Sequence, residues 1–189
     1  VTGVQTCALP IYIKNLRSPD GSKPGYQSCY VPRSAHFTGD AMGHEMAWIG
    51  KELHFVNTRF SSVCVLDSHW SFKPIWRPSF ITADAPEDRC HLNGMACEGG
   101  KIRFLTALGE TDTNQGWREK KANGGCVIDY QNNRVVARGL CMPHSPRLYG
   151  GQLWFLESGT GSLCTVDPQS GTVTAKISFP GFVRGLDFY

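Results

Sequence analysis

The chain has 189 residues, of which 41% are hydrophobic and 19% are charged, and this balance is typical of a globular protein rather than a disordered one. Its net charge is only +3 and no block of Lys or Arg occurs, which argues against nucleic acid as the main partner because phosphate binding needs clustered basic residues. No run of about 18 apolar residues occurs, so no membrane span is expected.

The N-terminal segment, VTGVQTCALPI, resembles the translation of a common sequencing adapter. Residues 1–11 are therefore interpreted as an artefact and set apart from the fold. Residues 12–189 are expected to form one domain, a partial β-propeller that is truncated at both ends.

Three repeats follow, each anchored on an apolar run directly after a Gly-containing turn. A polar residue stands nine positions before each anchor, with spacings of 49 and 51 residues, at His44, Asn93 and His144. The C-terminal segment FVRGLDFY resembles the start of a fourth repeat, with Arg184 in the same column. A fixed period of this length indicates an array of similar structural units.

Each repeat is predicted to form four short strands, because alternating or β-branched and aromatic runs are bounded by turn residues. The expected strands are 45–49, 52–58, 62–67 and 72–78, then 94–98, 101–107, 125–130 and 134–139, and finally 147–149, 152–158, 163–167 and 172–179. Four strands in roughly 40–50 residues are typical of a propeller blade. The predicted fold class is therefore all-β, a partial β-propeller of about three and a half blades. Because propellers have about 4–8 blades, the chain is expected to be a fragment of a larger ring.

A Cys-x-x-Asp pattern follows each anchor, beginning at Cys64, Cys126 and Cys164. These three thiols are interpreted as small buried hydrophobic side chains on equivalent third strands. No C-x-x-C spacing occurs, so a structural zinc site is not expected. Free thiols favour a reducing compartment, and a cytoplasmic location is expected.

One end of the predicted blades carries the long, unusual loops, while the other end carries short Gly, Asn and Asp turns. The column of His44, Asn93, His144 and Arg184 opens the innermost strands at the long-loop end. These side chains are expected to face the central channel and form a polar site for a small-molecule or peptide ligand. Imidazoles there would bind a metal or transfer protons. The alternative is that the column hydrogen-bonds neighbouring blades and holds the ring together.

Two further groups are candidates on the same face. Glu110 and Asp112 begin a long insert in the second repeat, where a carboxylate would complete a metal shell or act as a base. Their alternative role is that of solvated loop residues. Arg147 and Arg184 are candidates for binding a carboxylate or phosphate, and salt bridges to nearby acids are the alternative.

Two functions remain open. By analogy with other propellers, the first is a metal-assisted hydrolase or lyase of a small molecule, in which His91 or His144 acts as acid or base. Asn93 and the carboxylates would then hold a divalent metal or orient a water. The second is a non-catalytic module that binds a peptide, a sugar or a protein. The sequence identifies no cofactor and no oligomeric state, and it contains no P-loop, dinucleotide fingerprint, H-E-x-x-H or G-x-S-x-G motif.

Several dense strings, including YVPRSAHFTGDAMGHEMAW, WRPSFITADAPEDRCHLNGMA and MPHSPRLYGGQLWFLESGTG, resemble one family of bacterial conserved hypothetical proteins. It is catalogued as domain of unknown function 4915, and the resemblance runs from about Tyr26 to Tyr189. The resemblance implies a propeller-like all-β fold and a longer parent protein, and it implies no particular activity. Its recognisable motifs include Glu87-Asp88-Arg89 and the stretch from Met142 to Arg147.

Overall fold

The computed structural model describes residues 6–13 and 29–188 and separates into two compact units, Val1–Asp40 and Ala41–Tyr189. The first unit contains an antiparallel hairpin of β1 (Thr6–Ile13) and β2 (Cys29–Phe37). The sequence patterns did not predict this hairpin, and β1 begins inside the segment that resembles an adapter. Residues 1–5 of that segment lie outside the described residues.

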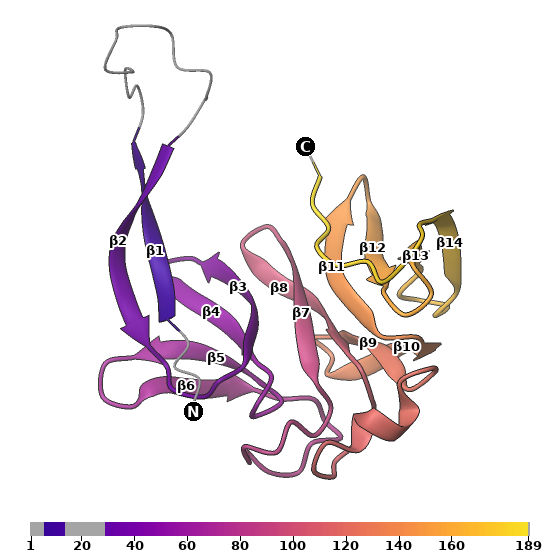
Figure 1. Cartoon of the computed structure of the whole chain (residues 1–189), viewed down its shortest axis with the longest axis horizontal. Coiled ribbons are helices and arrows are strands. Elements are labelled where there is room, and N and C mark those ends of the chain that lie inside the picture. Colours follow the sequence, from indigo (N-terminus) through magenta and orange to yellow (C-terminus); the bar gives the residue numbers. More distant parts are fainter. Residues whose placement is uncertain (1–5, 14–28, 189) are drawn as a thin grey trace, which may run out of the picture. The chain divides into compact units, whose positions relative to one another are not determined.

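The second unit consists of three four-stranded antiparallel sheets (Figure 1). Within each sheet, neighbouring strands are consecutive in the chain. The first sheet contains β3 (Gly43–Ile49), β4 (Glu52–Asn57), β5 (Ser62–Asp67) and β6 (Ser71–Trp76). The second contains β7 (Leu92–Glu98), β8 (Lys101–Ala107), β9 (Gly125–Asp129) and β10 (Arg134–Leu140). The third contains β11 (Pro143–Tyr149), β12 (Gln152–Glu157), β13 (Ser162–Val166) and β14 (Val173–Ser178). The predicted all-β fold with four strands per repeat is confirmed.

Strand β11 is the one element whose predicted start was wrong by more than two residues: it begins at residue 143 rather than 147. Pro143 and Pro146 hide the strand pattern, because proline cannot donate a hydrogen bond to the ladder. The structure accommodates them through a register shift between His144 and Arg147 in the pairing of β11 with β12.

The first strands of the three sheets lie side by side, because β7 packs against both β3 and β11. This is the arrangement of successive propeller blades around a channel. Gly94 of β7 permits the closest approach, since a Cβ atom there would lie 2.3 Å from Cδ of Pro146 in β11.

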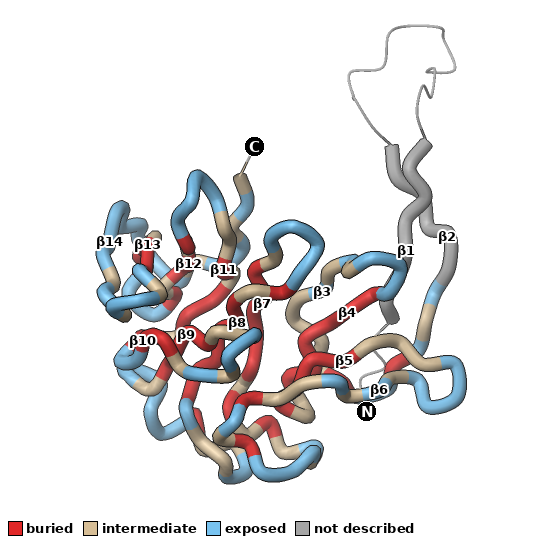
Figure 2. The backbone as a smooth tube through the Cα atoms, turned by 180° about the vertical axis from the view of Figure 1, so that it is seen from behind, coloured by how far each residue is buried: buried red, intermediate tan, exposed pale blue. Residues whose placement is uncertain are grey.

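Two hydrophobic cores lie between consecutive blades. Figure 2 shows that buried residues concentrate on the strands of the sheets. Between the first and second blades, Val56 and Val63 pack with Leu105 and other apolar residues of the second blade. Between the second and third blades, Phe104 packs with Phe155. The predicted burial of Cys64, Cys126 and Cys164 is confirmed, and burial raises the pKa of each thiol.

The aspartates of the Cys-x-x-Asp patterns close the turn between the third and fourth strands of each blade. Asp67 Oδ1 accepts hydrogen bonds from the backbone of His69 and Trp70 at 2.8 Å each. Asp129 and Asp167 accept equivalent bonds in the next two blades. The repeated pattern therefore couples a buried thiol on the strand to an aspartate that shapes the following turn.

The long insert of the second blade contains one short 3-10 helix, η1 (Gly116–Lys120). Across the described ranges, no helix combines the length and apolar character that crossing a bilayer would require.

Candidate functional site

The links that enter the three blades share an unusual backbone conformation. The residues two positions before His44, Asn93 and His144 all have positive φ: Met42 at 49°, His91 at 51° and Met142 at 54°. The residues three positions before these kinked residues also have positive φ: Gly39 at 69°, Asp88 at 49° and Gly139 at 78°. Left-handed φ values are uncommon for residues other than glycine and cost free energy, so a surrounding structure must hold them. The chain is thus kinked in the same way before each innermost strand.

The kink directs a backbone carbonyl at the imidazole of the column in two of the blades. Nδ1 of His44 lies 2.8 Å from the carbonyl oxygen of Met42, and Nδ1 of His144 lies 2.9 Å from that of Met142. A carbonyl oxygen only accepts, so each Nδ1 carries the hydrogen and each Nε2 presents a lone pair.

A hydroxyl group 14 residues further along also contacts each of these imidazoles: Thr58 Oγ1 lies 2.7 Å from Nδ1 of His44, and Ser158 Oγ lies 2.9 Å from Nδ1 of His144. Thr58 in turn donates to the carbonyl of Leu92 in the second blade. The His44 imidazole is therefore fixed to the link of its own blade and to the neighbouring blade.

Both imidazoles are held neutral near pH 7. Burial lowers the pKa of His144 to about 4, and the positive charge of Arg184 lowers it further than burial alone would. Burial is also the main cause of the lowered pKa of His44, with contributions from His91 and Arg184 that exceed the opposing effect of Asp88. His44 and His144 therefore act as hydrogen-bond acceptors at Nε2.

Asn93 occupies the same column, but its amide is engaged within the scaffold. Its Nδ2 donates to the carbonyl of Pro143 at 3.1 Å, and its Oδ1 accepts from Thr106 Oγ1 at 2.7 Å. Only 4% of the residue is exposed. This geometry corresponds to the structural alternative, in which the column joins blades, and a ligand role for Asn93 stays a prediction.

His91 forms a separate dyad with a buried carboxylate. Its Nδ1 lies 3.0 Å from both carboxylate oxygens of Asp88, a residue that is only 1% exposed. Trp117 Nε1 donates to the same carboxylate at 3.1 Å, and the Trp117 ring lies 4.4 Å from the ring of His91. The Asp88 carboxylate fixes the hydrogen of His91 on Nδ1, so Nε2 is again the open acceptor.

The three imidazoles and Arg184 gather at the start of the innermost strands, and we call His44, His91, His144 and Arg184 the histidine cluster. The rings of His44 and His91 meet edge to face with centroids 5.0 Å apart. Arg184 is exposed and lies near enough to both His44 and His144 to affect their protonation. Among the described residues, Arg184 has no hydrogen-bond or ion-pair partner. His144 is the most enclosed imidazole, 3% exposed and 6.0 Å from the ring of Phe182.

The dyad is a departure from the repeat. The first and third blades have glycine and methionine at the two kinked positions, whereas the second has Asp88 and His91. Glycine adopts positive φ without steric cost, so an aspartate there is strained and is retained by its contacts. Sequence reasoning did not single out Asp88 as a site residue. The change from G-x-x-M to D-x-x-H was the signal that would have found it.

The insert of the second blade covers the dyad through Trp117. The guanidinium of Arg118 lies 4.7 Å from the Trp117 ring centroid, and the ammonium of Lys121 lies 5.6 Å from it. Trp117 is buried between these cations and His91. The insert thus shields one face of His91 from water.

Three other predicted site residues already have charged partners. Arg147 pairs with Glu45, with nitrogen–oxygen distances of 3.1 and 3.4 Å, and this pair joins β11 to β3. Glu110 pairs with Arg138 at 2.6 Å. Asp112 accepts from Arg89 at 2.8 Å and from Thr82, and these hydrogen bonds lower the pKa of Asp112. Ligand roles for Arg147, Glu110 and Asp112 stay predictions.

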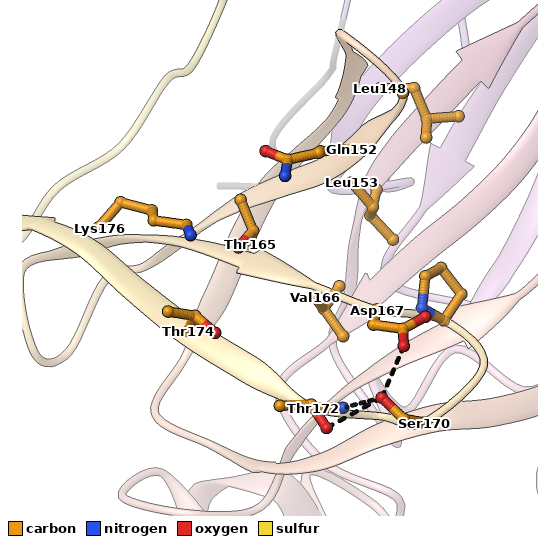
Figure 3. Close-up of a pocket in the computed structure, with 12 residues that line it drawn as sticks. Leu148, Gln152, Leu153, Thr165, Val166, Asp167, Ser170, Thr172, Thr174 and Lys176 are labelled. Atoms are coloured by element: carbon orange, nitrogen blue, oxygen red, sulfur yellow. Dashed lines mark hydrogen bonds between the residues drawn. The ribbon is translucent and has the colours of Figure 1, made fainter.

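The part of the chain that the structure describes contains no group of three or more His, Cys, Asp or Glu side chains arranged to hold a metal ion. The histidine cluster is therefore not a ready-made metal site. A cavity of about 560 Å³ occurs elsewhere, at the short-turn end of the third blade (Figure 3). Its lining includes Gln152 and Lys176, and its floor is a turn in which Ser170 hydrogen-bonds Asp167 and Thr172.

Comparison with solved structures returns distant all-β likenesses. Virginiamycin B lyase from Staphylococcus aureus superposes with a TM-score of 0.43 and 14% identity, covering 95% of this chain and 61% of that one. Hydrazine synthase from Kuenenia stuttgartiensis superposes with a TM-score of 0.42 and 13% identity, covering 72% of this chain and 35% of that one. The chain thus spans less than two thirds of either, and no activity transfers at this distance. No curated protein matches the chain. Residues 10–189 do match a family described as "Domain of unknown function (DUF4915)", and the chain belongs to that family.

Proposed function

We propose that this protein is an enzyme that moves a proton on a small molecule at the channel mouth, in a hydrolysis or an elimination. The observation that carries the proposal is the dyad of His91 and the buried Asp88. An imidazole oriented by a buried carboxylate is the arrangement that general bases use, because the carboxylate fixes the tautomer and stabilises the imidazolium that forms.

In the proposed step, Nε2 of His91 takes a proton from the substrate or from a water molecule. The positive charge that appears on the ring lies 3.0 Å from the Asp88 carboxylate, which compensates it. Trp117 holds the other side of that carboxylate and keeps water from one face of the imidazole. His91 can then return the proton to a leaving group as a general acid.

The neighbouring imidazoles differ from His91 in their surroundings. Burial and the positive charge of Arg184 lower the pKa of His144 and of His44. His91 is instead hydrogen-bonded to the Asp88 carboxylate, and this contact favours it as the general base. In this proposal His144, an expected acid or base from the sequence, acts as a neutral neighbour rather than as the proton carrier.

The test is a screen of the chain against esters, lactones and substrates of elimination, followed by comparison of His91→Gln with His69→Gln. His69 is exposed in the β5–β6 turn at the other end of the first blade, so it controls for loss of an imidazole. We expect His91→Gln to lower turnover about 100-fold or more and His69→Gln to leave it unchanged. Undiminished turnover in His91→Gln would remove the dyad from the mechanism. Ligand affinity without turnover would instead favour the non-catalytic binding module.

A further inference from the structure

The three imidazoles of the histidine cluster share one hydrogen-bonding state. Nδ1 faces a carbonyl oxygen in His44 and His144, and it faces a carboxylate in His91. Each of these partners only accepts, so all three rings carry their hydrogen on Nδ1. Each ring therefore has its lone pair on Nε2, and none of the three has an imidazole N–H group left for a ligand.

Lone pairs of this kind select for hydrogen-bond donors. A neutral Nε2 repels the oxygen of an anion, whereas it accepts a hydrogen bond from a hydroxyl group. The rings of His44 and His91 meet edge to face with centroids 5.0 Å apart, so the two imidazoles are close enough to contact one small molecule. Burial and the nearby positive charges keep His44 and His144 in this accepting state near neutral pH.

Arg184 supplies an exposed guanidinium beside His44 and His144. Three other arginines near this face are in ion pairs, Arg147 with Glu45, Arg89 with Glu87 and Asp112, and Arg138 with Glu110, while Arg118 lies over Trp117. Arg184 is exposed and has no such partner among the described residues. A single guanidinium matches the single charge and the two oxygens of a carboxylate, which it binds through two parallel hydrogen bonds. A phosphate dianion would need more donors than the cluster has.

We infer that the histidine cluster binds a small hydroxylated carboxylate, of the sugar-acid type, with its carboxylate on Arg184 and its hydroxyl groups on Nε2 of His44 and His91. The inference rests on the proposed function for the position of the ligand, and it adds the chemical class. The hydroxyl or carbon that faces His91 is then the one that loses the proton.

The experiment is isothermal titration of the chain with three matched six-carbon probes. Gluconate has the carboxylate and the hydroxyl groups, sorbitol has only the hydroxyl groups, and hexanoate has only the carboxylate. Galacturonate and threonate are titrated in parallel to vary ring closure and length, and glucose 6-phosphate supplies the phosphate. We expect at least one hydroxylated carboxylate to bind at least tenfold more tightly than sorbitol, hexanoate and the phosphate ester.

Variants locate the site. Arg184→Gln is expected to weaken binding about 10- to 100-fold, the effect of removing a charged hydrogen-bond partner. Arg134→Gln is the matched control, because Arg134 is an exposed arginine of β10 in another part of the second unit. His44→Ala is expected to weaken binding of gluconate but not of hexanoate. Thermal melting of each variant checks that the fold is intact.

The outcomes separate this inference from the proposed function. Binding that Arg184→Gln weakens and Arg134→Gln does not, while no probe is turned over, would keep the ligand class and reject the enzyme. Turnover of a neutral ester that Arg184→Gln leaves unchanged would keep the enzyme and reject the ligand class. The inference is overturned if no hydroxylated carboxylate binds, if glucose 6-phosphate binds more tightly, or if Arg134→Gln weakens binding as much as Arg184→Gln.

Discussion

Nδ1 of His91 lies 3.0 Å from both carboxylate oxygens of Asp88, a residue with 1% of its surface exposed. A buried carboxylate is costly unless its hydrogen bonds are made, and His91 and Trp117 make them here. The pair therefore constrains both partners: Asp88 sets the tautomer of His91, and His91 helps to satisfy Asp88.

Asp88→Asn tests this constraint directly. The amide has nearly the same shape, but its nitrogen donates, so it no longer selects hydrogen on Nδ1 of His91. We expect turnover to fall about 100- to 10,000-fold with little change in ligand affinity. Nitrogen NMR of the labelled imidazole should show a shift toward the other tautomer. Asp84→Asn is the control, since Asp84 forms an exposed pair with Arg77, and a spectrum of Asp88→Asn that matches the unmodified protein would refute the constraint.

The buried imidazole of His144 predicts a dependence of stability on pH. Its pKa in the fold is about 4, below the ordinary value of 6.5, so the unfolded chain binds more protons between these values. The free energy of unfolding should be greatest above pH 6.5 and should fall by roughly 3 kcal/mol as the pH drops to 4. Urea titrations across this range measure the effect. His144→Gln should flatten the slope and His69→Gln should not, and equal slopes in both variants would contradict the assignment.

The ion pair of Arg147 with Glu45 is expected to stabilise the packing of the first and third blades. Both side chains are about three quarters buried, at 26% and 22% exposure, so solvent screens them less than a surface pair. A double-mutant cycle with Arg147→Met and Glu45→Gln should give a coupling energy of about 1 kcal/mol. The more exposed pair of Arg103 with Glu98 should give less than about 0.5 kcal/mol in the same cycle. Equal coupling in the two cycles would show that burial adds nothing.

Gly94→Ala is expected to destabilise the second unit through steric overlap alone. A Cβ atom at this position would lie 2.3 Å from Cδ of Pro146 and 2.5 Å from Oγ1 of Thr106. Overpacking of this kind costs about 1–3 kcal/mol, measured as a loss in the free energy of unfolding. Pro146→Ala removes Cδ and should recover part of the loss when combined with Gly94→Ala. If the double variant is no more stable than Gly94→Ala, the overlap with Pro146 is not the cause.

The link before the second blade should tolerate substitution to the sequence pattern of the other two links without loss of the fold. In a triple variant, Asp88→Gly and His91→Met give this link the glycine and methionine that the links of the first and third blades have. The third change, Trp117→Phe, removes the indole N–H group, which would otherwise lose its acceptor on Asp88. Glycine relieves strain at a φ of 49°, so we expect a melting temperature within a few degrees of the parent and no turnover. A variant that fails to fold would show that the dyad is structural rather than functional.

The strands of the three four-stranded sheets could be predicted because alternation and turn residues are local features of the sequence, whereas the hairpin of β1 and β2 was not predicted. Alternation and turn residues fixed strand ends to within two residues outside β11, where Pro143 and Pro146 interrupt the pattern. The repeat column also grouped Arg184 with His144, 40 residues earlier in the sequence, and Arg184 does lie near enough to lower the pKa of His144.

The partners within the site could not be predicted in the same way. Whether Arg147 meets a ligand or Glu45 depends on the distance between β3 and β11, which no local pattern encodes. Trp117 reaches Asp88 only because the insert folds back over the link, and the sequence leaves that path open. Asn93 shares a column with His44, yet its amide is consumed by Pro143 and Thr106.

The kinked links before the innermost strands are suited to redesign. Each link has two positions of positive φ, and all of these positions except Gly139, near the end of β10, lie outside the strands of the three sheets. An Asp and His pair placed at Gly139 and Met142 would meet left-handed φ values of 78° and 54°, against 49° and 51° at Asp88 and His91. Reactive side chains can therefore be added to, moved between or removed from individual links while the sheets stay unaltered.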